Sequence, residues 1–243
     1  LAEKRQMNAK KLKLNKKRDI PYIVALAAFT AFAFLIVILS TVDVRTAANG
    51  GKIGLGGMNI AVSVAIGYGD EWYKISQILG YATLAVAAFN ALVAVWQYYK
   101  RKKLLAVDKE YLCLCALYVA VAILYVAFDT FAVNYRPTSP SNALEPSFPS
   151  SHTLLAFTVL GSSAVVELRK IKNEPIKIAV VSVESAVAVI LVVARTLSGV
   201  HWLTDIIGSV ILSLALVACF TGVLGGFDSD EEIKNKENAK EEA

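Results

Sequence analysis

The chain has few of the residues that build metal centres or disulfide-linked domains. Its 243 residues include only three cysteines, Cys113, Cys115 and Cys219, and only two histidines, His152 and His201. The cysteines lie inside apolar segments and have no Cys-x-x-Cys spacing, so neither a zinc site nor a disulfide framework is indicated. Our expectation of no cofactor and no metal rests on the site residues described below.

Charged side chains are also scarce. They make up 19% of the sequence, against 56% hydrophobic residues and a mean hydropathy of +0.54. Soluble domains are about 45–50% apolar, and the apolar residues here come in runs of about 20, enough to cross roughly 30 Å of hydrocarbon as a helix. This composition excludes an ordinary soluble domain, and we expect no nucleic-acid partner.

Six apolar runs predict an all-α bundle of six transmembrane helices. The first run is too long for the core of a signal peptide and is expected to be retained. The fourth is short and must begin near Ser150 to span the membrane. The runs cover residues 21–42, 75–97, 111–133, 152–167, 177–197 and 203–225.

Short polar tails are expected to flank this bundle. The prediction divides the chain into a basic tail over 1–20, a membrane domain over 21–226 and an acidic, disordered tail over 227–243. Met7 is a candidate for the natural first residue. Nothing in the sequence indicates an oligomeric state.

The lysines and arginines predict the orientation of the bundle. All but five of the 25 lie in the N-terminal tail, in the loops after runs two and four, or in the C-terminal tail. Since cytoplasmic segments are enriched in basic residues, both termini are predicted to be cytoplasmic. The basic N-terminal tail is expected to lie on anionic lipid headgroups of the cell membrane.

The outer loops differ in character. Residues 43–72 are rich in glycine, and the apolar stretch Met58 to Ile66 within them is expected to form a short interfacial helix. We favour a plain connecting loop over a lid. Residues 134–151 hold four of the six prolines, which makes that loop stiff and non-helical.

Unusual polar residues gather at the predicted outer ends of runs three to six. Run three ends at Arg136, run four begins with Ser150, Ser151 and His152, run five ends at Arg195, and run six begins with His201 and Asp205. Two scattered histidines and two scattered arginines would rarely converge at adjacent helix ends. This convergence predicts a site at the outer membrane face.

Each residue type in this group suits the binding and cleavage of a phosphate ester. Arginine offers a planar fork of donors to phosphate oxygens. A helix start at Ser150 and Ser151 aims backbone N–H groups at an anion. If run six has begun at His201, its side chain shares a helix face with Asp205, which can then fix the imidazole tautomer for attack on phosphorus. His152 can protonate the leaving oxygen.

The three motifs resemble the type 2 phosphatidic acid phosphatase superfamily of membrane lipid phosphate phosphatases. The family pattern is Lys, six residues, Arg-Pro; then Pro-Ser-Gly-His; then Ser-Arg, five residues, His, three residues, Asp. Here Arg136-Pro137, residues 149–152 and residues 194–205 correspond. The third motif is the most specific of the three.

The resemblance implies a metal-independent hydrolase of lipid phosphates or diphosphates. By this correspondence His201 forms a phosphohistidine, Asp205 orients it and His152 is the general acid. Arg136, Arg195 and Ser150, with the neighbouring Ser151, bind the phosphoryl group. Candidate substrates are undecaprenyl pyrophosphate, phosphatidic acid and phosphatidylglycerol phosphate, and nothing in the apolar surfaces distinguishes them.

Three positions depart from the family pattern. Asp129 stands where the family has lysine, Ser151 replaces glycine and Ala194 replaces serine. An acid at 129 either weakens the binding of highly charged substrates or pairs with Arg136 along the same helix face. The alternatives that stay open are a non-catalytic relative or transporter that binds anionic lipid, and a haem protein with two histidine ligands.

Overall fold

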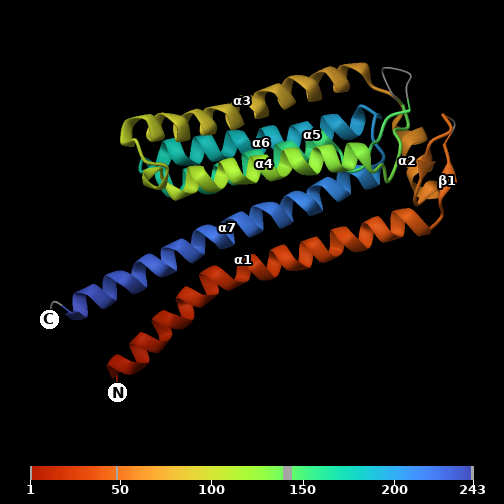
Figure 1. Ribbon diagram of the computed structural model, residues 1–243. Coiled ribbons are helices and arrows are strands. Elements are labelled where there is room, and N and C mark those ends of the chain that lie inside the picture. The colour runs from red at the N-terminus through yellow and green to blue at the C-terminus, as the bar shows by residue number, and fades with distance from the viewer. Residues whose placement is uncertain (1, 48, 139–143, 242–243) are drawn as a thin grey trace.

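The computed structural model describes the backbone of residues 2–47, 49–138 and 144–241, and the side chains of 19–47, 49–138 and 144–229. Over these ranges the chain forms long helices with a short helix and a small hairpin at one end (Figure 1). In the hairpin, β1 (Arg45–Thr46) pairs antiparallel with β2 (Lys52–Ile53). The helices are α1 (Ala2–Thr41), α2 (Gly56–Ile66), α3 (Asp70–Arg101), α4 (Lys109–Thr130), α5 (Ser151–Lys170), α6 (Glu174–Leu197) and α7 (Leu203–Glu241), with a 3-10 turn at Leu104–Ala106.

Six of the described helices are long and apolar enough to cross a membrane, which confirms the six predicted spans. Helices suit this environment because they satisfy every backbone hydrogen bond internally. The protein is therefore a multi-pass integral membrane protein. The fourth span begins at Ser151, as its length required, and the predicted interfacial helix is α2.

Two of the spans form the inside of the bundle. The most apolar windows of α5 and α7 are 50% and 56% buried, whereas those of the other four spans are 11–22% buried. Figure 1 shows α1 alongside α7, with α3, α4 and α6 grouped around α5. The side chain of Asn90 in α3 joins this group by donating to Ser163 of α5 at 3.1 Å and to Tyr118 of α4 at 3.2 Å.

Both termini lie at one end of the molecule, and α2 and the hairpin lie at the other (Figure 1). The connections 42–69, 131–150 and 198–202 are at this second end, because each follows an odd-numbered membrane span. The helix ends predicted to carry the site are therefore brought together.

The C-terminal tail differs from the prediction, because α7 continues to Glu241 through residues predicted to be disordered. At the other end of the chain, helix α1 begins at Ala2 and includes the basic tail. The acidic tail is rich in Glu, Lys and Ala, which are strong helix formers, and it extends a helix that is already nucleated. The basic side chains expected to contact anionic lipid lie within residues 1–18, outside the described side chains.

An aromatic cluster fixes the segment that leads into α5. Phe148 stacks on Phe32 of α1 with ring centroids 5.6 Å apart and meets Phe128 of α4 edge-on at 6.1 Å. On α7 only a glycine fits beneath this ring, because a Cβ on Gly208 would lie 2.4 Å from Phe148 Cε2. The cluster thus joins α1, α4 and α7 around the start of α5.

We predict that Phe148→Ala lowers the free energy of unfolding by about 3 kcal/mol, because it empties a fully packed position. The measurement is an SDS titration of the protein in detergent micelles. The control is Phe131→Ala, whose side chain is 76% exposed. Equal effects of the two substitutions would contradict the structural role of the cluster.

Candidate functional site

A tight turn after α6 brings Arg195 and His201 together. The hydroxyl of Ser198 donates to the carbonyl of Arg195 at 2.7 Å and closes the end of the helix. Gly199 follows with a φ of +67°, and a Cβ there would lie 2.0 Å from the carbonyl oxygen of Gly67. Glycine is required at this turn for both reasons.

The N-terminus of α7 holds Asp205 by its two carboxylate oxygens. Oδ2 accepts from the backbone N–H of Trp202 at 3.0 Å, as in half of a capping box, and Oδ1 accepts from Asn134 Nδ2 at 3.1 Å. The side chain is fully buried. These donors leave the carboxylate little freedom to turn away from the neighbouring histidine.

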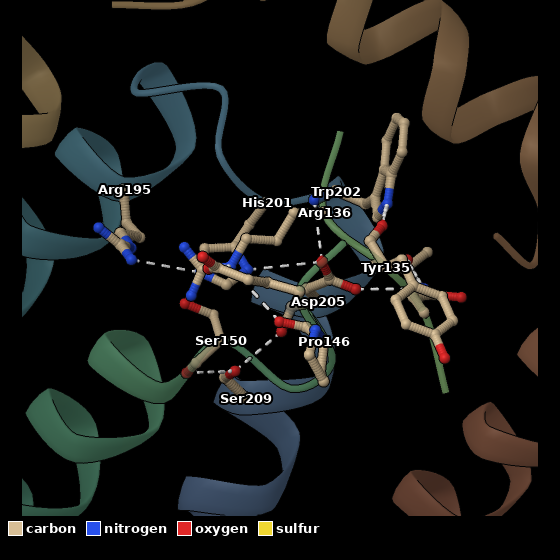
Figure 2. A network of polar contacts seen from close by, with 12 residues as sticks. Tyr135, Arg136, Pro146, Ser150, Arg195, His201, Trp202, Asp205 and Ser209 are labelled. Atoms are coloured by element: carbon tan, nitrogen blue, oxygen red, sulfur yellow. Dashed lines mark hydrogen bonds and ion pairs between the residues drawn. The ribbon is translucent and has the colours of Figure 1, made fainter. Parts of the chain in front are cut away.

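His201 lies between Asp205 and Arg195 (Figure 2). Its Nδ1 is 3.5 Å from Asp205 Oδ2, and its Nε2 is 3.4 Å from Arg195 Nη2. A carboxylate on one side and a donor on the other favour the neutral tautomer with its proton on Nδ1 and a lone pair on Nε2. Helix α7 begins only at Leu203, so the two side chains meet across a turn and not along one helix face as predicted.

The protonation of His201 follows from its surroundings. Burial, reinforced by the positive charges of Arg195 and Arg136, holds the pKa of His201 well below its usual value. The imidazole is therefore neutral at neutral pH, which is the state in which Nε2 is a nucleophile.

Arg195 is buried to an unusual degree for a cation. Its side chain is 1% exposed; it donates from Nη1 to the Ser76 hydroxyl at 3.1 Å and lies 5.5 Å from the ring centroid of Tyr73. Within the described residues it forms no ion pair with a carboxylate, and its Nε has no hydrogen-bond partner. A buried guanidinium without a counter-ion is an attractive position for an anion.

Arg136 approaches the same place from the 131–150 segment. Its Nε lies 3.3 Å from Glu145 Oε2, and the loop is held by Trp202 Nε1, which donates to the carbonyl of Tyr135 at 2.5 Å. The predicted pair between Arg136 and Asp129 is not found, because α4 ends at Thr130 and the two residues do not share a helix. Asp129 is exposed and forms no hydrogen bond or ion pair with any described residue.

The helix start at Ser150 is confirmed, since Ser150 is the N-cap residue of α5. Its hydroxyl is fully buried, caps no backbone N–H and has no partner among the residues with described side chains. Ser151 begins the helix, and His152 follows on the side that faces α3. The structure therefore places a buried hydroxyl without a described hydrogen-bond partner at the start of α5.

Two hollows meet at this end of the bundle. A narrow cavity is lined by His201 together with Asp129, Arg136, Ser151, Tyr125 and Leu154. A groove of about 520 Å³ runs between α3, α4 and α5 and has His152 at its rim. The two hollows adjoin each other, because both are lined by Tyr125, Ser151 and Leu154.

Several residues that hold this arrangement were not predicted from the sequence. Asn134 has its side chain between Asp205 and Gly54, whose N–H donates to its Oδ1 at 3.0 Å. Asn59 of α2 exchanges two hydrogen bonds with Thr204 at the start of α7, at 2.9 and 3.3 Å. Neither Asn134, in the proline-rich loop, nor Asn59, in the glycine-rich loop, belongs to a motif that would have revealed this role.

Six membrane-spanning helices and a buried cluster of histidine, arginine and aspartate at one end define a polytopic membrane protein with a polar site at the end of its helix bundle. The PAP2 superfamily model matches residues 125–225, the part of the chain that carries this cluster. This match confirms the resemblance drawn from the three motifs.

One solved structure shares the fold over most of the chain. It is the crystal structure of the first transmembrane PAP2 type phosphatidylglycerolphosphate phosphatase from Bacillus subtilis, with a TM-score of 0.57 and 19% sequence identity. The match covers 85% of this chain and 96% of that one. No curated protein matches the sequence.

We predict that Asn134→Ala lowers kcat for phosphate-ester hydrolysis by about 10- to 100-fold, the size expected for losing a hydrogen bond to a buried carboxylate. KM should change little, because Asn134 contacts Asp205 and not the cavity. The control is Asn90→Ala, which removes a buried amide in the middle of the bundle. Equal losses of kcat in the two variants, after matching for stability, would show that Asn134 has no special role.

Proposed function

We propose that the protein hydrolyses a phosphate or diphosphate ester of a membrane lipid, with His201 as the nucleophile. The observation that carries this proposal is the buried Arg195 guanidinium, which touches His201 Nε2 and has no carboxylate partner among the described side chains. A phosphoryl group offers the guanidinium the charged acceptor that it lacks, and it brings phosphorus next to the imidazole.

In the first step His201 Nε2 bonds to phosphorus and the bond from phosphorus to the ester oxygen breaks. His152, in its protonated form, gives its proton to that oxygen, and Asp205 stabilises the positive charge that develops on His201. Arg195, Arg136 and the Ser150 hydroxyl bind the remaining phosphoryl oxygens. Because these donors are already fixed, they stabilise the charge of the transition state without reorganising.

In the second step water replaces the histidine. His152 takes a proton from the water molecule as its oxygen bonds to phosphorus, and the bond between phosphorus and Nε2 breaks. Inorganic phosphate leaves, and both histidines return to their starting states. The charge is neutralised by arginines and backbone dipoles, so no metal ion is needed in this scheme.

The groove beside His152 supports a lipid as the substrate. Most of its wall is apolar, including Leu84, Val121, Leu155 and Val159, and it opens between helices that cross the membrane. An acyl or prenyl chain in this groove would place its ester oxygen near His152 and its phosphate beside His201. Phosphatidylglycerol phosphate is one candidate, in agreement with the name of the Bacillus subtilis protein. Phosphatidic acid and undecaprenyl pyrophosphate are the others.

The distribution of basic residues supports an outward-facing site. If the protein lies in the cell membrane with both termini in the cytoplasm, the end with α2 and the hairpin faces outward. The site would then act on lipids of the outer leaflet, and recycling of a carrier lipid would be a suitable role.

A haem protein is disfavoured by the surroundings of His201. Its two ring nitrogens face Asp205 and Arg195, at 3.5 and 3.4 Å, and not a position open to an iron ligand. A non-catalytic lipid binder remains the alternative that the next experiment separates from the enzyme.

We predict that purified protein releases phosphate from at least one of the three candidate lipids in the presence of EDTA, and that His201→Ala reduces this release by at least about 10⁴-fold, as for loss of a nucleophile. Lipid binding by the variant should persist, because Arg195 and Arg136 remain. Wild-type protein that binds these lipids but releases no phosphate would establish the non-catalytic alternative.

We predict that Asp129→Lys lowers KM for a lipid diphosphate by about 10-fold, because it exchanges an anion for a cation in the wall of the cavity that contains His201. Asp129→Asn should give an intermediate value. The matched control is Thr130→Lys, which adds a cation one residue further on, outside this cavity. Unchanged turnover and KM in Asp129→Lys would remove Asp129 from the determinants of specificity.

A further inference from the structure

One face of helix α3 contacts two residues of the site: Arg195 and His152, the proposed general acid. Helix α3 lies outside residues 125–225, the segment that matches the superfamily model. Tyr73, Ser76 and Gly80 follow one another at helical spacing on this face. Ser76 and Gly80 are buried, and α3 packs against both α5 and α6. The contacts that these residues make are of two different kinds.

Ser76 contacts Arg195. Its hydroxyl accepts from Arg195 Nη1 at 3.1 Å and donates to the carbonyl of Tyr73 at 2.7 Å, so its lone pair is directed at the guanidinium. The ring of Tyr73 covers the same guanidinium, 5.5 Å from its centroid. Both contacts restrict the orientation of a cation that forms no ion pair with a carboxylate in the described part of the chain.

Gly80 contacts His152. A Cβ on Gly80 would lie 2.7 Å from Cδ2 and 3.2 Å from Nε2 of His152, and the three nearest atoms all belong to that ring. The missing side chain therefore makes the space in which the imidazole lies. Because the atoms that a methyl group would displace are at the far end of one side chain, the helix can accommodate the group by moving His152 alone.

We propose that α3 is a positioning element of the site, which orients the phosphate-binding Arg195 through Ser76 and sets the place of the general acid His152 through Gly80. This inference rests on the proposed function. It predicts that the two α3 residues act on separate parts of the first chemical step: Ser76 on the binding of the phosphoryl group, and Gly80 on the protonation of the leaving oxygen.

The test compares p-nitrophenyl phosphate with benzyl phosphate, using kcat/KM because it reports the step that breaks the ester bond. The nitrophenolate leaves with little help from an acid, whereas the benzyl alkoxide needs a proton. Gly80→Ala should lower kcat/KM for benzyl phosphate by about 10- to 100-fold and that for p-nitrophenyl phosphate by less than about 3-fold. Ser76→Ala should lower both by a similar factor of about 10.

A double-mutant cycle separates positioning from a general structural defect. If Gly80 acts through the ring of His152, Gly80→Ala should cause no further loss in a His152→Ala background, where the ring is absent. The control is Gly226→Ala, a helical glycine whose added Cβ meets no atom within 4 Å. All variants are compared at matched thermal stability in the same detergent.

Each outcome distinguishes the proposals. Equal losses for the two esters in Gly80→Ala, or the same loss with and without His152, would overturn the role of Gly80 while leaving the proposed hydrolase intact. A selective effect of Ser76→Ala on benzyl phosphate would overturn the division of labour along α3. Wild-type protein that hydrolyses neither the two esters nor any lipid phosphate would contradict the proposed function and this inference together.

Discussion

The site depends on a buried positive charge that no carboxylate among the described side chains neutralises. Arg195 is 1% exposed, and the contacts it does make, with Ser76, Tyr73 and His201, are with uncharged groups. Taking a guanidinium out of water is costly, and an ordinary core would supply a carboxylate to offset it. The nearest acid of the site, Asp205, instead faces the other side of His201. The imidazole therefore separates the anion of the protein from the cation, and in the proposed reaction a phosphoryl group would supply the missing negative charge.

Such an arrangement must be held rigidly, and the polar segments at this end of the bundle do this. The β1–β2 hairpin and the segment that carries Arg136 support each other. Tyr135 donates its backbone N–H to the carbonyl of Lys52 at 3.1 Å, and Asn49 donates to the carbonyl of Arg136 at 2.6 Å. Asn134 and Asn59 extend this support to Asp205 and Thr204 at the start of α7. The glycine-rich loop thus does more than connect two spans, because its backbone and amides hydrogen-bond to the segments around His201.

The sequence predicts the spans and the gathering of polar residues well, because bilayer thickness and helical geometry leave few alternatives for six long apolar runs. It predicts less about the positions inside the site. The pairing of Asp129 with Arg136 assumed that one helix continues to 136, whereas α4 ends at Thr130 and Glu145 approaches Arg136 from the loop. Likewise Asn134, Ser76 and Gly80 act through partners far along the chain, and neither periodicity nor motif spacing contains that information.

The two histidines line different hollows, so in the proposed reaction each would face a different part of the substrate. His201 lines the cavity that contains Arg136, and His152 lines the apolar groove, while Ser151 borders both. In an ester the oxygen that must be protonated is the one that carries the chain, so the acid belongs on the side of the groove and the nucleophile on the side of the phosphate. In the proposed reaction phosphorus would lie between the two rings, with attack and departure on opposite sides as in-line displacement requires. A single pocket lined by both histidines would not distinguish the two ends of the substrate, whereas two adjoining hollows of different polarity do.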